Sequence, residues 1–305
     1  MRRILPVLAL VAAAVSAPLV VSAGTRNGLS LDFSREVLDA AGAGGLPGSG
    51  LAGHARAELW LAARALDTGD WPLALDHALP LAIAGDFLAG QYAARAYEGL
   101  GALAAAIDLL HATGGVGELL RIGLAAHRAG DLETARRAYA AAWELDPRLA
   151  TDRLALVLAD LGRPEEVEQV FLSALEQVGR YDRRTPGWQR GLARLYAEQE
   201  RWVEAVGAYE AALATAGYDP AFDVGTVYYE IAWAYSRIGM HADAVAAIEI
   251  AVELDPSATS YLRLGAIHEA AGRPDLALAA YRQVLDLNPD SRPAQEAVER
   301  LEAGG

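Results

Sequence analysis

Two pairs of side chains with helical spacing are the best candidates for binding another molecule. Arg190 and Arg194 are four residues apart, and Tyr229 and Trp233 repeat that spacing further along the chain. Residues four apart lie on one face of an α-helix, so each pair presents its side chains together. Guanidinium groups bind carboxylates, and aromatic faces accept apolar or cationic side chains. The chemistry on offer is recognition of a peptide; the simpler alternative is a solvated arginine face, with Trp233 packed between helices.

The residue types that usually carry catalysis form no recognisable constellation. The six histidines contain no HExxH sequence and no close pair with metal-ligand spacing. All 26 basic residues are arginine and there is no cysteine, which excludes a phosphate-loop lysine, a Schiff-base lysine and a thiol nucleophile. We therefore predict a protein that is not an enzyme and needs no cofactor and no metal. An active site on the loops around Tyr181 and Tyr218 is the enzymatic alternative.

The composition indicates a helical protein. Hydrophobic residues make up 53% of the 305 residues and aromatic residues only 7%, because alanine and leucine supply most of the apolar content. Both are strong helix formers. The formal net charge of -14 removes the electrostatic attraction that supplies most nonspecific affinity for nucleic acid, so nucleic acid is not an expected partner.

The amino terminus predicts export. Two arginines precede an apolar stretch that ends in a small-residue cleavage site, so residues 1–23 are predicted to be a signal peptide. The alternative is an uncleaved anchor in the inner membrane, because residues 4–23 carry no charge and are just long enough to span it. Either form places the body in the periplasm or outside the cell, and the absence of lysine indicates a bacterial protein from a GC-rich genome. Residues 24–54 are rich in glycine and are interpreted as a flexible tether.

A pattern repeats from residue 55 onward. Seven units begin near Ala55, Phe87, Val116, Arg148, Pro186, Gly225 and Ala258. Their shared turn position reads Gly69, Gly101, Gly130, Gly162, Glu200, Gly239 and Gly272. A small residue stands seven positions before each turn, and alanine, or once valine, stands five positions after it. Antiparallel helices pack tightly only where the side chains at their crossing are small, so each unit is predicted to be helix, turn, helix. His268 takes the place of Tyr196 and Tyr235 in the two preceding units and is expected to pack between helices.

These units resemble the tetratricopeptide repeat family, most closely over residues 116–147, 225–256 and 258–289. The similarity is carried by Tyr228, Ile231, Ala232, Tyr235, Gly239, Ala244, Ile248, Ala251 and Pro256, which follow the family's pattern. The resemblance implies an all-α fold, a right-handed α-solenoid of about seven helix-turn-helix units over residues 55–289. Residues 290–305 are predicted to form a capping helix and tail.

The resemblance also implies that the first helices of successive units line a concave groove for a protein or peptide partner. The positions expected to face that groove are Gln91, Arg95, His127, Asp152, Arg190, Arg194, Tyr229, Trp233, Arg237 and Glu269. The Lys and Asn side chains with which family members clamp a C-terminal carboxylate are missing from these positions. The predicted role is a binding scaffold or adaptor; the alternative is a structural subunit of an envelope complex that assembles through its ends or convex face.

Overall fold

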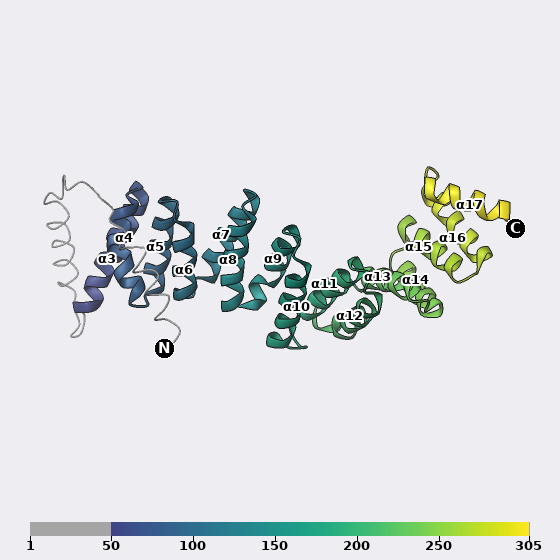
Figure 1. The fold of residues 1–305 in the computed structure, drawn as a ribbon, viewed down its shortest axis with the longest axis horizontal. Coiled ribbons are helices and arrows are strands. Elements are labelled where there is room, and N and C mark those ends of the chain that lie inside the picture. The colour runs from purple at the N-terminus through teal and green to yellow at the C-terminus, as the bar shows by residue number, and fades with distance from the viewer. Residues whose placement is uncertain (1–49, 305) are drawn as a thin grey trace. The chain divides into compact units, whose positions relative to one another are not determined.

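The computed structural model describes residues 50–304, and this part of the chain is almost entirely helical (Figure 1). It contains fifteen α-helices, one short 3-10 helix and no β-strand, which confirms the predicted all-α class. No helix within residues 50–304 is long and apolar enough to span a bilayer. The predicted signal peptide and residues 24–49 of the predicted tether lie outside the described residues.

Fourteen of the helices follow one another as seven pairs, and the fifteenth closes the series. The pairs are α3 (Gly50–Thr68) and α4 (Trp71–Ile83), α5 (Phe87–Gly99) and α6 (Leu103–Thr113), α7 (Val116–Arg128) and α8 (Leu132–Leu145), α9 (Pro147–Asp160) and α10 (Pro164–Val178), α11 (Thr185–Glu198) and α12 (Trp202–Thr215), α13 (Val224–Arg237) and α14 (His241–Leu254), and α15 (Ala258–Ala270) and α16 (Pro274–Leu287). The last helix is α17 (Arg292–Gly304), and the 3-10 helix η1 spans Ala216–Tyr218.

The chain divides into two compact halves. The N-terminal half ends at Leu161, after α9, and the C-terminal half begins at Gly162, before α10. Helix α3 begins at Gly50, so residues 50–54 belong to a helix and the predicted tether is too long by five residues. A glycine inside a helix costs about 1 kcal/mol relative to alanine and does not end the helix, which is why glycine content alone misplaced this boundary.

The turns inside the repeats have the left-handed backbone that the sequence predicts. Six of the seven turn positions are glycines with positive φ angles, namely Gly69, Gly101, Gly130, Gly162, Gly239 and Gly272. The seventh is Glu200, with φ of 59°, among the described residues the only one other than glycine with a positive φ. A side chain is unfavourable in this region, so Glu200 is held there by the helices on either side.

The helix pairs meet at small side chains. The alanines five positions after the turns are completely buried, and they are Ala74, Ala106, Ala135, Ala205, Ala244 and Ala277. At Gly265 a Cβ atom would lie 2.5 Å from the ring of Tyr281, so even a methyl group is too large there. The predicted helix crossings are therefore confirmed for the six pairs that lie within one half of the chain.

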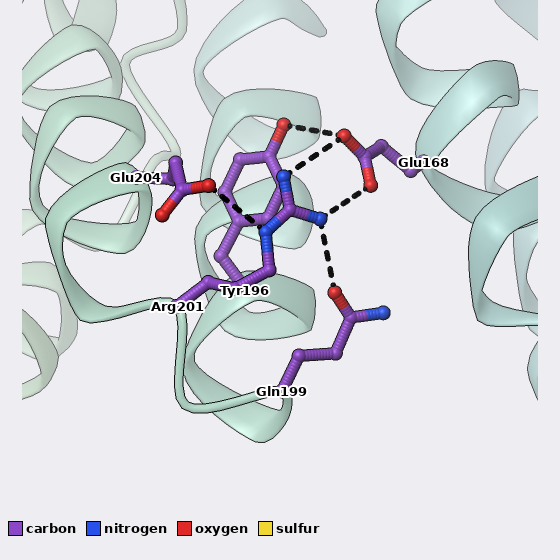
Figure 2. A network of polar contacts seen from close by, with 5 residues as sticks. All are labelled: Glu168, Tyr196, Gln199, Arg201 and Glu204. Carbon is purple, nitrogen blue, oxygen red and sulfur yellow. Dashed lines mark hydrogen bonds and ion pairs between the residues drawn. The ribbon is translucent and has the colours of Figure 1, made fainter.

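An ionic network fastens the first two helices of the C-terminal half to the turn that follows them (Figure 2). Arg201 donates to both carboxylate oxygens of Glu168 at 2.7 and 3.3 Å, and its guanidinium lies 4.3 Å from the ring centroid of Tyr196. Gln199 and Glu204 accept its remaining hydrogen bonds at 3.0 Å each. The hydrogen bond from Arg201 holds the pKa of Glu168 below its usual range. Four of the hydrogen bonds of this arginine go to side chains of the same molecule, so it acts as a structural tie.

The C-terminal helix covers the last pair. Ala297 of α17 is buried and belongs to one apolar cluster with Ala277 and Tyr281 of α16. His268 on α15 is also buried, with 6% of its surface exposed, in agreement with its predicted packing role. Burial lowers the pKa of this imidazole, which therefore stays neutral at physiological pH.

The packing at the crossings predicts the effect of enlarging one alanine. Ala244→Leu forces extra methyl groups into a fully buried crossing and is expected to lower the free energy of unfolding by about 1–3 kcal/mol. Ala246→Leu on the exposed side of the same helix is the matched control and is expected to change it by less than about 0.5 kcal/mol. Chemical denaturation followed by circular dichroism measures both; equal midpoints for the two variants would contradict this helix register.

Candidate functional site

Arginines and aromatic rings lie close together on α12, α13 and α15 of the C-terminal half. Arg263 on α15 lies with its guanidinium carbon 4.0 Å from the ring centroid of Tyr229 and 5.1 Å from that of Trp233, both on α13. Arg237 on α13 lies 5.2 Å from the ring of Trp202 on α12 and 5.9 Å from that of Trp233. A guanidinium over an aromatic face is attracted to its electron density. We call Trp202, Tyr229, Trp233, Arg237 and Arg263 the Arg–aromatic cluster.

A pocket of about 260 Å³ opens beside this cluster. Its lining residues come from α11, α12, α13 and α15 and are Arg194, Ala197, Glu198, Trp202, Tyr209, Tyr229, Glu230, Trp233 and Arg263. Trp233 is 37% exposed, whereas Tyr209 is buried. Burial raises the pKa of the Tyr209 hydroxyl, so this part of the wall is uncharged.

A second hollow of about 780 Å³ adjoins the first, because Tyr229 lines both. It lies among the start of α13, the end of α14 and the start of α15, and its wall carries the hydroxyl groups of Thr226, Ser257, Thr259 and Ser260. The hydroxyl of Thr226 donates to Asp223, and those of Ser257 and Ser260 bond to each other, so Thr259 carries the hydroxyl of this wall that is open to the main chain of an extended peptide. The two hollows together form what we call the groove.

Arg190 differs from its predicted role. Its guanidinium donates two hydrogen bonds to Glu230 on α13, at 2.8 and 2.9 Å, and Arg194 lies 3.9 Å from the same carboxylate. The hydrogen bond to Glu230 raises the pKa of Arg190. The expected open arginine pair is therefore half occupied: Arg190 ties α11 to α13, while Arg194, with 59% of its side chain exposed, faces the pocket.

The structure brings five of the predicted groove residues into one region, and they are Arg190, Arg194, Tyr229, Trp233 and Arg237. Glu269 lies elsewhere, because its carboxylate accepts hydrogen bonds from Tyr281 at 2.7 Å and from Arg300 of α17 at 2.6 Å. Glu269 thus fastens the C-terminal helix and is not available to a ligand in the groove, which corrects the prediction.

The remaining predicted positions belong to the N-terminal half. Gln91 and Arg95 are on α5, and Arg95 pairs with Glu118 at 3.3 Å. His127 on α7 contacts the carboxylate of Asp160 at 2.7 Å, and Asp152 is exposed on α9. These side chains lie on the surface and take part mostly in local ion pairs.

Among the charged and aromatic residues of the Arg–aromatic cluster and its ion pairs, Trp202, Glu230 and Arg263 were missed from the sequence. Trp202 begins a second helix, and only first helices were expected to face the groove. Glu230 directly follows Tyr229, and Arg263 stands four positions after Thr259 on the next first helix. The helical spacing of Thr259 and Arg263, both of which line pockets, was the signal available for Arg263.

No cluster of three or more potential metal ligands is found within residues 50–304. The arrangement offers the exposed ring of Trp233, guanidinium groups and hydroxyl groups along an open groove. These groups bind by stacking, ion pairing and hydrogen bonding. The fold and the site together define a helical repeat protein with a groove suited to an extended segment of another chain.

Comparison with known families identifies the repeats. Residues 190–222 and residues 229–292 each match the tetratricopeptide repeat family. The C-terminal half therefore contains tetratricopeptide repeats, as the sequence pattern indicated.

The similar proteins differ in size and role. The human protein O-mannosyl-transferase TMTC1 is 27% identical over 185 residues, which make up 59% of this chain but only 20% of that protein. The solved structure of YrrB, described as a TPR protein with an unusual peptide-binding site, is 18% identical with a TM-score of 0.50, covering 59% of this chain and 90% of that one. MamA is 20% identical with a TM-score of 0.49, covering 57% and 92% of the two chains. At these identities the likeness to the solved structures concerns the fold alone.

The ion pair between Arg190 and Glu230 predicts that loss of Glu230 lowers the free energy of unfolding more than loss of Arg194. Glu230→Ala leaves Arg190, with 26% of its side chain exposed, without its partner and is expected to cost about 1–3 kcal/mol of unfolding free energy. Arg194→Ala removes only an exposed contact at 3.9 Å and is expected to cost less than about 1 kcal/mol. Urea denaturation of both variants tests this; a larger loss for Arg194→Ala would show that the pairing is wrong.

Proposed function

We propose that this protein is a binding scaffold that holds an extended segment of a partner protein in the groove of its C-terminal half. The observation that carries this proposal is the pair of adjoining hollows that share Tyr229, one walled by aromatic rings and arginines and the other by hydroxyl groups. Trp233 is exposed and Tyr229 is half-buried, both beside arginines, and Trp, Tyr and Arg are the residue types that dominate binding energy at protein interfaces. A rigid helical frame supports them, so little conformational entropy is lost when a ligand binds.

The proposal gives the protein a binding role and no catalytic one. The groove wall contains no histidine, and its carboxylates, among them Glu230, lie beside arginines or at helix ends. General acid–base catalysis needs a titratable group of shifted pKa placed against a substrate. Tetratricopeptide repeat proteins are in general scaffolds, which agrees with this assignment.

A photo-crosslinking experiment tests the proposed groove. A photoreactive amino acid at position 198, which lines the pocket, is expected to capture a partner protein in cells. The same group at position 203, on α12 with 70% of Val203 exposed, serves as the matched control. Tyr229→Ala with Trp233→Ala should abolish capture from position 198 while circular dichroism shows an unchanged helical fold.

The structural-subunit alternative predicts the opposite pattern. Capture from position 203 alone, insensitive to the Tyr229 and Trp233 substitutions, would place the interaction outside the groove and overturn the proposal. The expected partner is a protein or peptide, with no nucleic acid involved.

We further propose that the protein is exported in a bacterial cell, on the strength of the signal-like residues 1–23. Fractionation and intact-mass measurement of the natural product are expected to give a periplasmic or extracellular chain that begins at Gly24. A full-length chain in the membrane fraction would support the anchor formed by residues 4–23. A full-length chain in the cytoplasmic fraction would contradict export.

A further inference from the structure

Each of the two arginines of the Arg–aromatic cluster lies within cation–π distance of two aromatic rings. The guanidinium carbon of Arg263 lies 4.0 Å from the ring centroid of Tyr229 and 5.1 Å from that of Trp233, and Arg237 lies 5.2 and 5.9 Å from the rings of Trp202 and Trp233. Stacking occupies the face of a guanidinium group and leaves the N–H groups at its edge free to donate in the plane. Neither arginine forms an ion pair with any part of the chain that the structure describes.

Arg201, in the same half of the molecule, is an arginine whose hydrogen bonds go to side chains of the protein itself. It also stacks on an aromatic ring, that of Tyr196 at 4.3 Å, but Glu168, Glu204 and Gln199 take up its N–H groups (Figure 2). The contrast separates two uses of one motif. Arg201 links two helices through its hydrogen bonds. Arg237 and Arg263 also lie against aromatic rings, but their N–H groups have no acceptor in the described part of the chain, and they lie beside a pocket.

The region around this pocket is positively charged, although the whole chain is negatively charged. The protein has a formal net charge of -14, yet four arginines gather here, namely Arg190, Arg194, Arg237 and Arg263. Glu230 forms ion pairs with both Arg190 and Arg194, and Asp223 also interacts electrostatically with Arg190. Glu198 lines the pocket without an ion pair in the described range. The four arginines outnumber the two carboxylates that line this pocket, Glu198 and Glu230. The adjoining hollow is lined by Asp223 and Asp255, so the excess of positive charge is confined to the pocket beside Trp233.

The pocket itself suits one apolar side chain. Its volume of about 260 Å³ is below the range typical of sites for whole small molecules. Aromatic rings of Trp202, Tyr209 and Trp233 form much of its wall, and such rings contribute large apolar contact areas.

We propose that the groove selects a partner segment in which acidic side chains flank an apolar one. The carboxylates bind the open edges of Arg237 and Arg263, and the apolar side chain enters the pocket beside Trp233. The aromatic rings fix the guanidinium groups in advance, so less side-chain entropy is lost when each pair of N–H groups meets a carboxylate. This inference rests on the proposed function and adds the chemical class of the ligand, an internal acidic and apolar segment.

Selection from a library of short random peptides displayed on phage tests the proposal with the full chain as bait. Enriched peptides are expected to carry Asp or Glu on either side of a large apolar residue. Binding of one enriched peptide, measured by fluorescence anisotropy, should weaken by about tenfold or more for each of Arg237→Gln and Arg263→Gln. It should also weaken as salt is raised, because the pairs are partly exposed.

Matched variants keep the result interpretable. Arg263→Lys retains the charge but not the planar fork, and is expected to bind more weakly than the wild type. Arg282→Gln on α16, where the side chain is 59% exposed and pairs with Glu302, is the control and should leave the affinity unchanged. Circular dichroism of every variant shows whether the helices persist.

Three outcomes would overturn the inference. In the first, the enriched peptides lack acidic residues, and their binding requires Tyr229 and Trp233 but not Arg237 or Arg263. This result would support the proposed groove and contradict its preference for carboxylates. If enriched peptides still bind the variants of Tyr229 and Trp233, or if no peptide is enriched at all, both proposals are contradicted. Self-association of the wild type that Arg237→Gln and Arg263→Gln abolish would make a second copy the occupant, in place of a partner segment.

Discussion

Close approach of paired helices at small side chains is the constraint on which the described structure depends. Completely buried alanines such as Ala205 and Ala244 let the second helix of a repeat lie directly against the first. At Gly265 even a methyl group would collide with Tyr281. The turn between the helices then has to reverse the chain within a few residues, and a left-handed backbone conformation does this at each of the seven turns. Tight pairing therefore sets where every first helix lies relative to its neighbour inside each half.

The candidate site follows from this arrangement in the C-terminal half. With α11, α13 and α15 side by side, Arg190 reaches Glu230 and Arg263 reaches Tyr229 and Trp233, although these residues are far apart in sequence. The arginines of this half have two different roles. Those with several acceptors, such as Arg201, fasten one helix to another, and those that only stack on rings remain available to a ligand. An acidic chain thereby keeps a small region of positive charge.

The sequence was sufficient for the periodic features and insufficient for contacts between repeats. Turn glycines and small residues recur at fixed intervals, so the seven pairs and the C-terminal helix could be predicted. The pairing of Arg190 with Glu230 depends on the relative rotation of α11 and α13, which one sequence does not specify, and for the same reason Glu269 was placed in the groove instead of against Arg300. The start of α3 at Gly50 was missed because glycine-rich composition suggests a loop without excluding a helix.

Fluorine NMR of the chain labelled with fluorotryptophan tests the central claim most directly. The six tryptophans report separately, and Trp202 and Trp233 line the pocket, while Trp60 and Trp71 lie in the N-terminal half. When the partner captured by crosslinking, or a peptide selected for binding, is added to saturation, the resonances of Trp202 and Trp233 are predicted to shift and those of Trp60 and Trp71 to stay in place. Saturable binding that leaves Trp202 and Trp233 unchanged would contradict the groove as the binding site.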